Sequence, residues 1–375
     1  MRPRTSAALA ASTVLGAGAA AVAVGRYTSD AALNPRRARP LPGERSLTVH
    51  SAEGRRIVLT RSLTALRPGT YGLAGGGGHA VVGPVVEDER RGADTVVRHL
   101  VRVSRGPIEP GARMRFTPQA YVGDPLDALG LEYQDVEVAG ELGTLPAWFL
   151  PDARSTWIIL VHGYGTTREH PMVVMSCLRR WRFPMLAPAY RGDPGAPPAP
   201  DGLNRLGGAE WHDLEHVLAE AVRQGAERVV LYGWSTGAGM ALHTATRSAY
   251  RERVAGLILD SPVLDRPATL RALIAAGHTP RPLLPLAVRA AQGRLGPEPE
   301  YLSRAYDPAE LTVPTLLLHG PDDRVASWEP SRELAAARPD LVSLHQVRQA
   351  PHGAMWNADP VGYQEALRRF LTPLM

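Results

Sequence analysis

The chain has 375 residues, of which 44% are hydrophobic and 21% charged, values typical of a globular protein with a large core. The formal net charge is +5, and the basic residues other than histidine are all arginines that are scattered along the chain, which argues against a nucleic-acid-binding surface. The single cysteine, Cys177, excludes an intramolecular disulfide, and we expect it to be a buried core residue.

The first predicted element is an uncharged stretch of mainly Ala, Gly and Val that runs over residues 7–25. It is long enough to span a bilayer, but it holds few strongly apolar residues, so insertion is marginal. Ala21-Val22-Ala23 also resembles a signal-peptide cleavage site. We therefore expect residues 1–29 to be a signal peptide or an N-terminal membrane anchor. The protein is then exported or anchored, with a cytoplasmic location left open.

Residues 30–45 are rich in Pro and Arg and are predicted to form a linker. Short β-like runs such as SLTVHS, HAVVGPVV and TVVRHLVRV follow, separated by Gly and Pro turns. They predict a small β-rich region over residues 46–127. No Lys-Ser or Lys-Thr pair follows the glycine run at 75–78, so a hairpin tip is a better interpretation than a phosphate-binding loop.

After residue 127 the pattern changes to short apolar runs that alternate with amphipathic stretches. This predicts a mostly parallel sheet with helices on both faces, which places reactive groups at the carboxyl ends of strands. Residues 263–310 interrupt the alternation with helical segments that are broken by prolines, and we expect this insertion to cap a pocket. The predicted catalytic domain spans residues 128–375.

The run VVLYGWSTGAG places Ser235 between a predicted strand and a predicted helix. Gly233 and Gly237 remove side chains that would clash in a tight strand-to-helix turn, which holds the serine at positive φ. The helix N-terminus also offers the backbone N–H of Thr236 to a developing oxyanion. Ser235 is therefore the predicted nucleophile.

A serine nucleophile needs a base, and the base needs a carboxylate that orients it. His352 is the predicted base because it follows the last strand-like run and precedes the final helix. His319 and His162 also end strands, but each precedes a glycine and is interpreted as shaping its loop.

Three aspartates lie at strand ends and could orient the base. These candidate acids are Asp260, at the end of GLILD, and Asp322 and Asp323, in HGPDDRV. Residue spacing alone leaves the choice among them open, and any that is not used would cap its loop through backbone N–H groups.

The order Ser, Asp, His, with the serine in a strand–turn–helix, resembles the α/β-hydrolase superfamily over about residues 128–375. The resemblance implies that the acid stands three residues after the glycine of His319-Gly320, which selects Asp323. It also implies a second oxyanion donor after the earlier His162-Gly163 pair, namely the backbone N–H of Tyr164. Thr236 departs from the family pattern, because many members carry Met, Gln or Leu there.

The fold predicted in this way is an α/β-hydrolase fold with a mostly parallel central sheet, flanking helices, a short helical cap and a small N-terminal β-rich region. We expect a serine hydrolase that cleaves a small-molecule carboxylic ester through an acyl-enzyme, without a metal or cofactor. Two alternatives stay open. They are a serine peptidase or acyl-aminoacyl hydrolase, and a non-catalytic binding protein on the same scaffold. The oligomeric state has no signature in the sequence.

Overall fold

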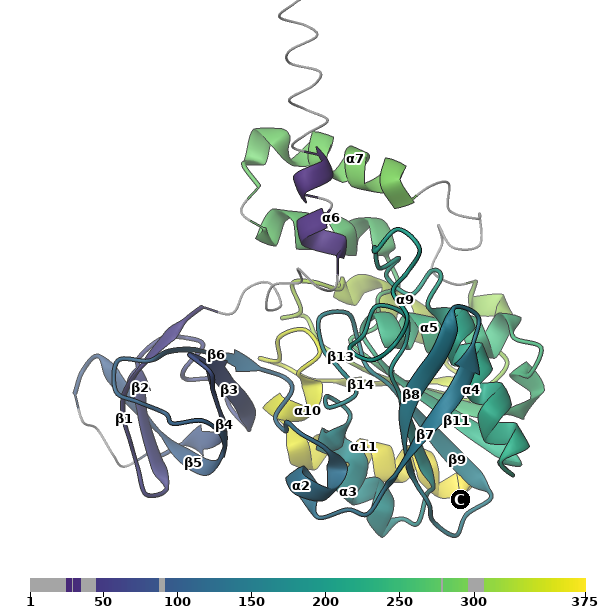
Figure 1. Ribbon diagram of the computed structural model, residues 1–375, viewed down its shortest axis with the longest axis horizontal. Coiled ribbons are helices and arrows are strands. Elements are labelled where there is room, and N and C mark those ends of the chain that lie inside the picture. The colour runs from purple at the N-terminus through teal and green to yellow at the C-terminus, as the bar shows by residue number, and fades with distance from the viewer. Residues whose placement is uncertain (1–24, 29, 35–44, 88–91, 278, 296–306) are drawn as a thin grey trace, which may run out of the picture.

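The computed structural model describes residues 25–28, 30–34, 45–87, 92–277, 279–295 and 307–375. Within these ranges the chain forms a small β-barrel, a larger unit of sheet and helices, and a helical pair that lies above the larger unit in Figure 1. None of the helices described is both long enough and apolar enough to cross a bilayer. The predicted segment 7–25 lies, apart from its last residue, outside the described residues.

Six antiparallel strands close the barrel in the order β1-β2-β5-β4-β3-β6. Their bounds are β1 (Leu47–Glu53), β2 (Arg56–Thr60), β3 (Tyr71–Gly75), β4 (Gly78–Val85), β5 (Thr95–Arg105) and β6 (Arg113–Thr117). Inward-facing side chains such as Ile57, Leu73 and Phe116 are buried and fill the barrel, as expected of one this small. Gly76 and Gly77 have positive φ at the tip of the β3–β4 hairpin, so the predicted hairpin is confirmed.

Eight strands form the sheet of the larger unit, in the order β14-β13-β12-β11-β9-β10-β8-β7. Their bounds are β7 (Gln134–Gly140), β8 (Gly143–Leu150), β9 (Thr156–Val161), β10 (Met185–Pro188), β11 (Arg228–Trp234), β12 (Val254–Asp260), β13 (Thr315–His319) and β14 (Val342–Gln346). Strand β8 pairs antiparallel with β7 and β10, and the other pairs are parallel. Every residue of β9, β12 and β13 is buried, as continuous apolar runs covered on both faces require.

Helices cover both faces of this sheet, as the alternating pattern predicts (Figure 1). One buried cluster joins the sheet to α3 (Met172–Arg180) and α11 (Pro360–Leu371). The cluster on the other face includes residues of α4 (Trp211–Arg223), α5 (Thr236–Arg247) and α9 (Trp328–Ala337). Two short helices, α2 (Pro125–Leu129) and α10 (Met355–Ala358), lie on the side that faces the barrel (Figure 1).

The predicted cap insertion contains α6 (Arg266–Ala276) and α7 (Leu284–Leu295), with a 3₁₀ turn at Arg281–Leu283 between them. Residues 25–28 and 30–33 are also helical and pack against this pair, with Ala32 and Leu33 in its apolar cluster. The first residues of the predicted linker are therefore packed rather than extended. The reason is local composition, because Ala31, Ala32 and Leu33 are apolar and the prolines and arginines come after them.

Candidate active site

Ser235 stands between the last residue of β11 and the first residue of α5, with φ 54° and ψ −116°. The residues two positions before and two positions after it must be glycines. A Cβ at Gly233 would lie 2.3 Å from the carbonyl oxygen of Gly237, and one at Gly237 would lie 2.3 Å from that of Val161. The Ser235 backbone N–H donates to the carbonyl of Asp260 on the neighbouring strand, at 2.8 Å. These contacts hold the hydroxyl at the carboxyl edge of the sheet.

The structure brings Ser235, His352 and Asp323 together. The Ser235 Oγ lies 2.6 Å from His352 Nε2, and His352 Nδ1 lies 2.7 Å from Asp323 Oδ2. Ser235 is 7% exposed, His352 4% and Asp323 8%, so water has little access to this line of hydrogen bonds. In this arrangement the imidazole can accept the serine proton while its other N–H donates to the carboxylate.

Asp323 is surrounded by donors in the loop after β13. Burial by itself raises the pKa of its carboxyl, but the charge of His352 and hydrogen bonds from His319 and His352 outweigh burial and hold the pKa far below its usual range. His319 Nε2 lies 3.2 Å from Asp323 Oδ2, and the backbone N–H groups of Val325 and Ala326 donate to Oδ1. The carboxylate is therefore ionised at neutral pH. His319 supports the acid as well as its loop, because a histidine that ends a strand stands within reach of an aspartate four residues later.

Asp260, the alternative acid, ends the adjacent strand but makes no hydrogen bond to His352 among the described residues. Its carboxyl accepts hydrogen bonds from the hydroxyls of Ser261 and Tyr363, each at 2.7 Å. Burial raises the pKa of Asp260 to about 7, although both hydroxyls and the charge of His352 oppose the shift. A half-protonated carboxyl without direct contact with the imidazole is poorly suited to orient it.

The loop that carries His352 is fixed on both sides. The Gly353 N–H donates to Ser261 Oγ at 3.0 Å, and the Gly353 carbonyl accepts from His170 Nε2 at 3.0 Å. Burial lowers the pKa of His170 to about 3, helped by the charges of His162 and His352, so His170 stays neutral as a donor. Asp322, the third candidate acid, accepts the N–H of Gln349 at 2.8 Å and thus caps the same loop.

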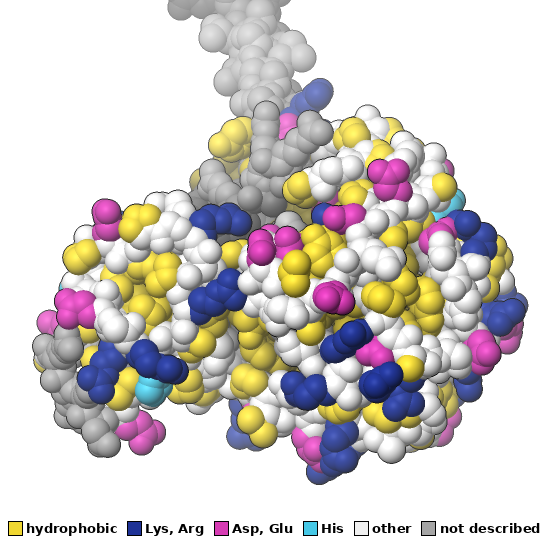
Figure 2. All heavy atoms as spheres, turned by 60° about the horizontal axis from the view of Figure 1, so that its bottom comes forward, with side chains coloured by type: hydrophobic (Ala, Val, Ile, Leu, Met, Phe, Trp, Pro, Cys, Tyr) yellow, Lys and Arg dark blue, Asp and Glu magenta, His cyan; other side chains and the backbone are white. Residues whose placement is uncertain are grey.

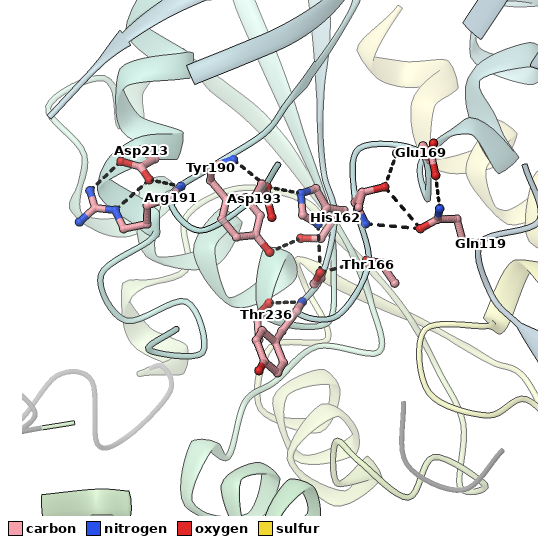
Figure 3. A network of polar contacts seen from close by, with 12 residues as sticks. Gln119, His162, Thr166, Glu169, Tyr190, Arg191, Asp193, Asp213 and Thr236 are labelled. Atoms are coloured by element: carbon pink, nitrogen blue, oxygen red, sulfur yellow. Dashed lines mark hydrogen bonds and ion pairs between the residues drawn. The ribbon is translucent and has the colours of Figure 1, made fainter. Parts of the chain in front are cut away.

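The two predicted oxyanion donors differ in the structure. Thr236 begins α5, and its N–H makes no hydrogen bond within the part of the chain that the structure describes. The Tyr164 N–H instead donates to the side-chain oxygen of Thr236 at 2.8 Å (Figure 3). The family resemblance implies that the Tyr164 N–H is free to bind the substrate. Here the hydroxyl of Thr236, which replaces Met, Gln or Leu, accepts that N–H instead. Rotamers of this kind have no signature in the sequence.

The loop that carries Tyr164 is held to the loop after β10 by a buried pair (Figure 3). His162 Nε2 lies 2.7 Å from Asp193 Oδ2, and the same oxygen accepts the Tyr190 N–H at 2.8 Å. The rings of His162 and Tyr190 stack with their centroids 4.5 Å apart. His162 therefore shapes its loop, as predicted, and it lies apart from the Ser235 line of hydrogen bonds.

Residues 158–373, more than half of the chain, match the model of the alpha/beta hydrolase family. The chain belongs to this family. Residues 48–117 match a second model, which is described as a domain of unknown function. No curated protein matches the chain.

Solved structures agree with the family assignment. One crystal form of the esterase Pf2001 of Pyrococcus furiosus is 23% identical, with a TM-score of 0.54, over 67% of this chain and 94% of that chain. A second crystal form is 20% identical, with a TM-score of 0.52, over 67% of this chain and 96% of that chain. At these identities the likeness shows the fold, and the predicted α/β-hydrolase fold is confirmed.

In this α/β hydrolase the barrel contacts the helix that follows the His352 loop. The side-chain amide of Asn357 in α10 donates to the carbonyls of Thr70 and Pro118, at 2.9 and 3.1 Å. The Thr70 N–H returns a bond of 2.8 Å to the Asn357 carbonyl. No feature of the sequence indicates this contact, because its partners are more than 200 residues apart.

Among the described residues, no three His, Cys, Asp or Glu side chains are grouped so as to hold a metal ion.

Proposed function

We propose that this hydrolase cleaves a carboxylic ester through an acyl-enzyme formed on Ser235. The observation that carries the proposal is the unbroken line of two short hydrogen bonds, 2.6 Å from Ser235 to His352 and 2.7 Å from His352 to Asp323. A hydroxyl, an imidazole and an ionised carboxylate in this order are what nucleophilic acyl transfer requires.

In the first half-reaction, His352 Nε2 takes the proton of Ser235 as the serine oxygen attacks the ester carbon. Asp323 keeps the other imidazole proton on Nδ1 and stabilises the cation that forms. When the tetrahedral intermediate collapses, the C–O bond to the alcohol breaks, and the alcohol leaves with the proton held by His352. Water then attacks the acyl group with His352 again as base, which releases the acid and restores Ser235.

The developing oxyanion is bound at the N-terminus of α5, where the N–H of Thr236 is available. The Tyr164 N–H becomes the second donor when a substrate oxygen displaces the Thr236 hydroxyl from its 2.8 Å bond. Because the threonine side chain can change rotamer, this exchange replaces a hydrogen bond to a neutral hydroxyl with a stronger, charge-assisted bond to the oxyanion.

An ester with an apolar part fits the surroundings of the site. Tyr164 belongs to the same buried apolar cluster as Leu270 and Ile274 of α6. Solved structures that share this fold include an esterase, which supports the same substrate class.

The test is covalent labelling of the purified chain by a fluorophosphonate. The wild type should label and Ser235→Ala should not. Ser248→Ala is the matched control and should still label, because Ser248 is also buried but stands at the C-terminal end of α5, away from Ser235. Labelling of Ser235→Ala would refute the assignment of Ser235 as the nucleophile.

A substrate panel tests the reaction itself. Short p-nitrophenyl esters should be hydrolysed, with peptide anilides inert. Turnover of anilides alone would establish the peptidase alternative. Absence of all turnover in a correctly folded protein would leave a binding protein on a hydrolase scaffold.

A further inference from the structure

The outer face of the cap exposes large apolar side chains. On α7, Ala287, Val288 and Ala291 face inward and are buried in the cap cluster. Leu286 of the same helix is 52% exposed and Leu283, just before it, is 37% exposed. Helix α7 is therefore apolar on the side that faces the protein. The start of its outward side is also apolar, which is unusual for a helix surface that faces only water.

The N-terminal helical segment extends this face. A Cβ on Gly25 would lie 2.4 Å from the Cβ of Ala290, and Arg294 Nη1 bonds to the carbonyl of Arg26, so residues 25 and 26 lie along α7. Tyr27, in the same segment, is 66% exposed. We call residues 25–28 together with residues 281–295 the outer cap face.

The outer cap face is basic. Residues 266–295 include no Asp or Glu. The exposed side chains of Arg26, Arg281 and Arg289 form no ion pair with a carboxylate in the described part of the chain. Elsewhere, exposed arginines pair within their own helices, for example Arg332 with Glu329 and Arg368 with Glu365. On the face away from the cap, basic and acidic side chains are interspersed (Figure 2).

We propose that the outer cap face rests on a bilayer surface that contains anionic phospholipid. Exposed leucines, an exposed tyrosine and arginines that pair with no carboxylate among the described residues are the combination that inserts at the boundary between headgroups and acyl chains. The position of Gly25 supports the same orientation. The uncharged stretch 7–25 ends at this residue. If that stretch were held in a membrane, the outer cap face would be the part of the protein next to the lipid surface. The proposal concerns orientation and does not depend on the reaction.

The test places an environment-sensitive fluorophore on the full chain at Leu286→Cys. The native Cys177 is buried, which raises the pKa of its thiol to about 12 and leaves it unreactive toward the label. The matched control is Val361→Cys in α11, where the native side chain is 81% exposed and the helix lies on the side away from the cap (Figure 1). Nitrobenzoxadiazole emission is recorded with vesicles of phosphatidylcholine and phosphatidylglycerol, and with phosphatidylcholine alone.

We expect emission at position 286 to rise about threefold or more and to shift to the blue with anionic vesicles, with a smaller change on phosphatidylcholine alone. The label at 361 should stay unchanged. The double variant Arg281→Glu with Arg289→Glu should abolish most of the response at 286. The control Arg228→Glu changes an exposed arginine at the amino end of β11 and should leave the response intact.

Two results would overturn the proposal. In the first, the protein floats with the vesicles while the label at 286 behaves like the label at 361, so the N-terminal stretch alone holds the protein. In the second, emission at 286 rises with protein concentration in the absence of lipid, so the face pairs with a second copy of the chain.

Discussion

The carboxyl ends of β12 and β13 are neighbours in the sheet, and each carries a buried aspartate. Asp260 is the last residue of β12 and Asp323 lies in the loop after β13, yet the two carboxyls have opposite surroundings. Asp323 accepts from two imidazoles and two backbone N–H groups. Among the described residues, the Asp260 carboxyl accepts only from the hydroxyls of Ser261 and Tyr363. A place at a strand end therefore leaves the role of an aspartate open, and the donors supplied by the following loop decide it.

The difference gives the two carboxyls pH effects of opposite sign. The lowered pKa of Asp323 contributes stability that is present above the unfolded pKa and is lost as pH falls toward the folded value. The raised pKa of Asp260 contributes stability that is present below the unfolded value of 3.8 and is lost as pH rises through about 7. One strand end thus favours a charged carboxylate and the other a neutral acid.

Neutralising each carboxyl in turn tests whether Asp323 and Asp260 have the different roles inferred for them. Asp323→Asn should lower kcat by about 10⁴-fold, because the amide favours the wrong imidazole tautomer and cannot balance the imidazolium charge. Asp260→Asn should cost less than about tenfold, since its carboxyl bonds to Ser261 and Tyr363 and, among the described residues, makes no hydrogen bond to His352. Steady-state hydrolysis of a p-nitrophenyl ester measures both. If Asp260→Asn is instead the crippling change, the roles of the two strand ends are reversed.

The pH dependence of the free energy of unfolding tests whether the pKa of Asp260 is raised in the folded protein. Between pH 4.5 and pH 8 the wild type should lose stability relative to Asp260→Asn, by roughly 3 kcal/mol, because only the wild type must ionise a buried carboxyl. Denaturant titrations of both proteins at the two pH values give the difference directly. Parallel curves for the two proteins would mean that the Asp260 carboxyl titrates normally.

The sequence was enough to predict which strand ends bring the candidate site residues together, and the reason is geometric. Parallel strands bring their carboxyl ends to one edge, so Ser235 and His352 could be named from strand patterns and their order. Choosing Asp323 over Asp260 required the family resemblance, because the donors that distinguish them are backbone N–H groups and a histidine whose orientation no pattern shows. The Thr236 rotamer and the Asn357 contact with the barrel escaped prediction for the same reason.

A third test removes one donor from the β13 end without touching the imidazole at position 352. His319→Phe deletes the N–H that lies 3.2 Å from Asp323 and should lower kcat about tenfold with little change in KM, equivalent to roughly 1.4 kcal/mol. Ser331→Ala is the control, since the Ser331 hydroxyl bonds to the far nitrogen of His319, Nδ1, at 2.8 Å. Equal losses in the two variants would indicate a packing defect rather than a missing donor.

The smallest effects are expected at the hydrogen bonds that Ser261 and Asp322 accept from backbone N–H groups of the His352 loop. Ser261→Ala leaves the buried N–H of Gly353 without its 3.0 Å partner and should destabilise the protein by about 1–2 kcal/mol. Asp322→Ala removes the partner of the Gln349 N–H, but that bond is exposed and water can replace it, so the loss should stay within about 0.5 kcal/mol. Chemical denaturation at pH 7 ranks the two variants. If Asp322→Ala proved the costlier change, the β13 end would hold the loop as well as the acid, and β12 would contribute little beyond the backbone bond to Ser235.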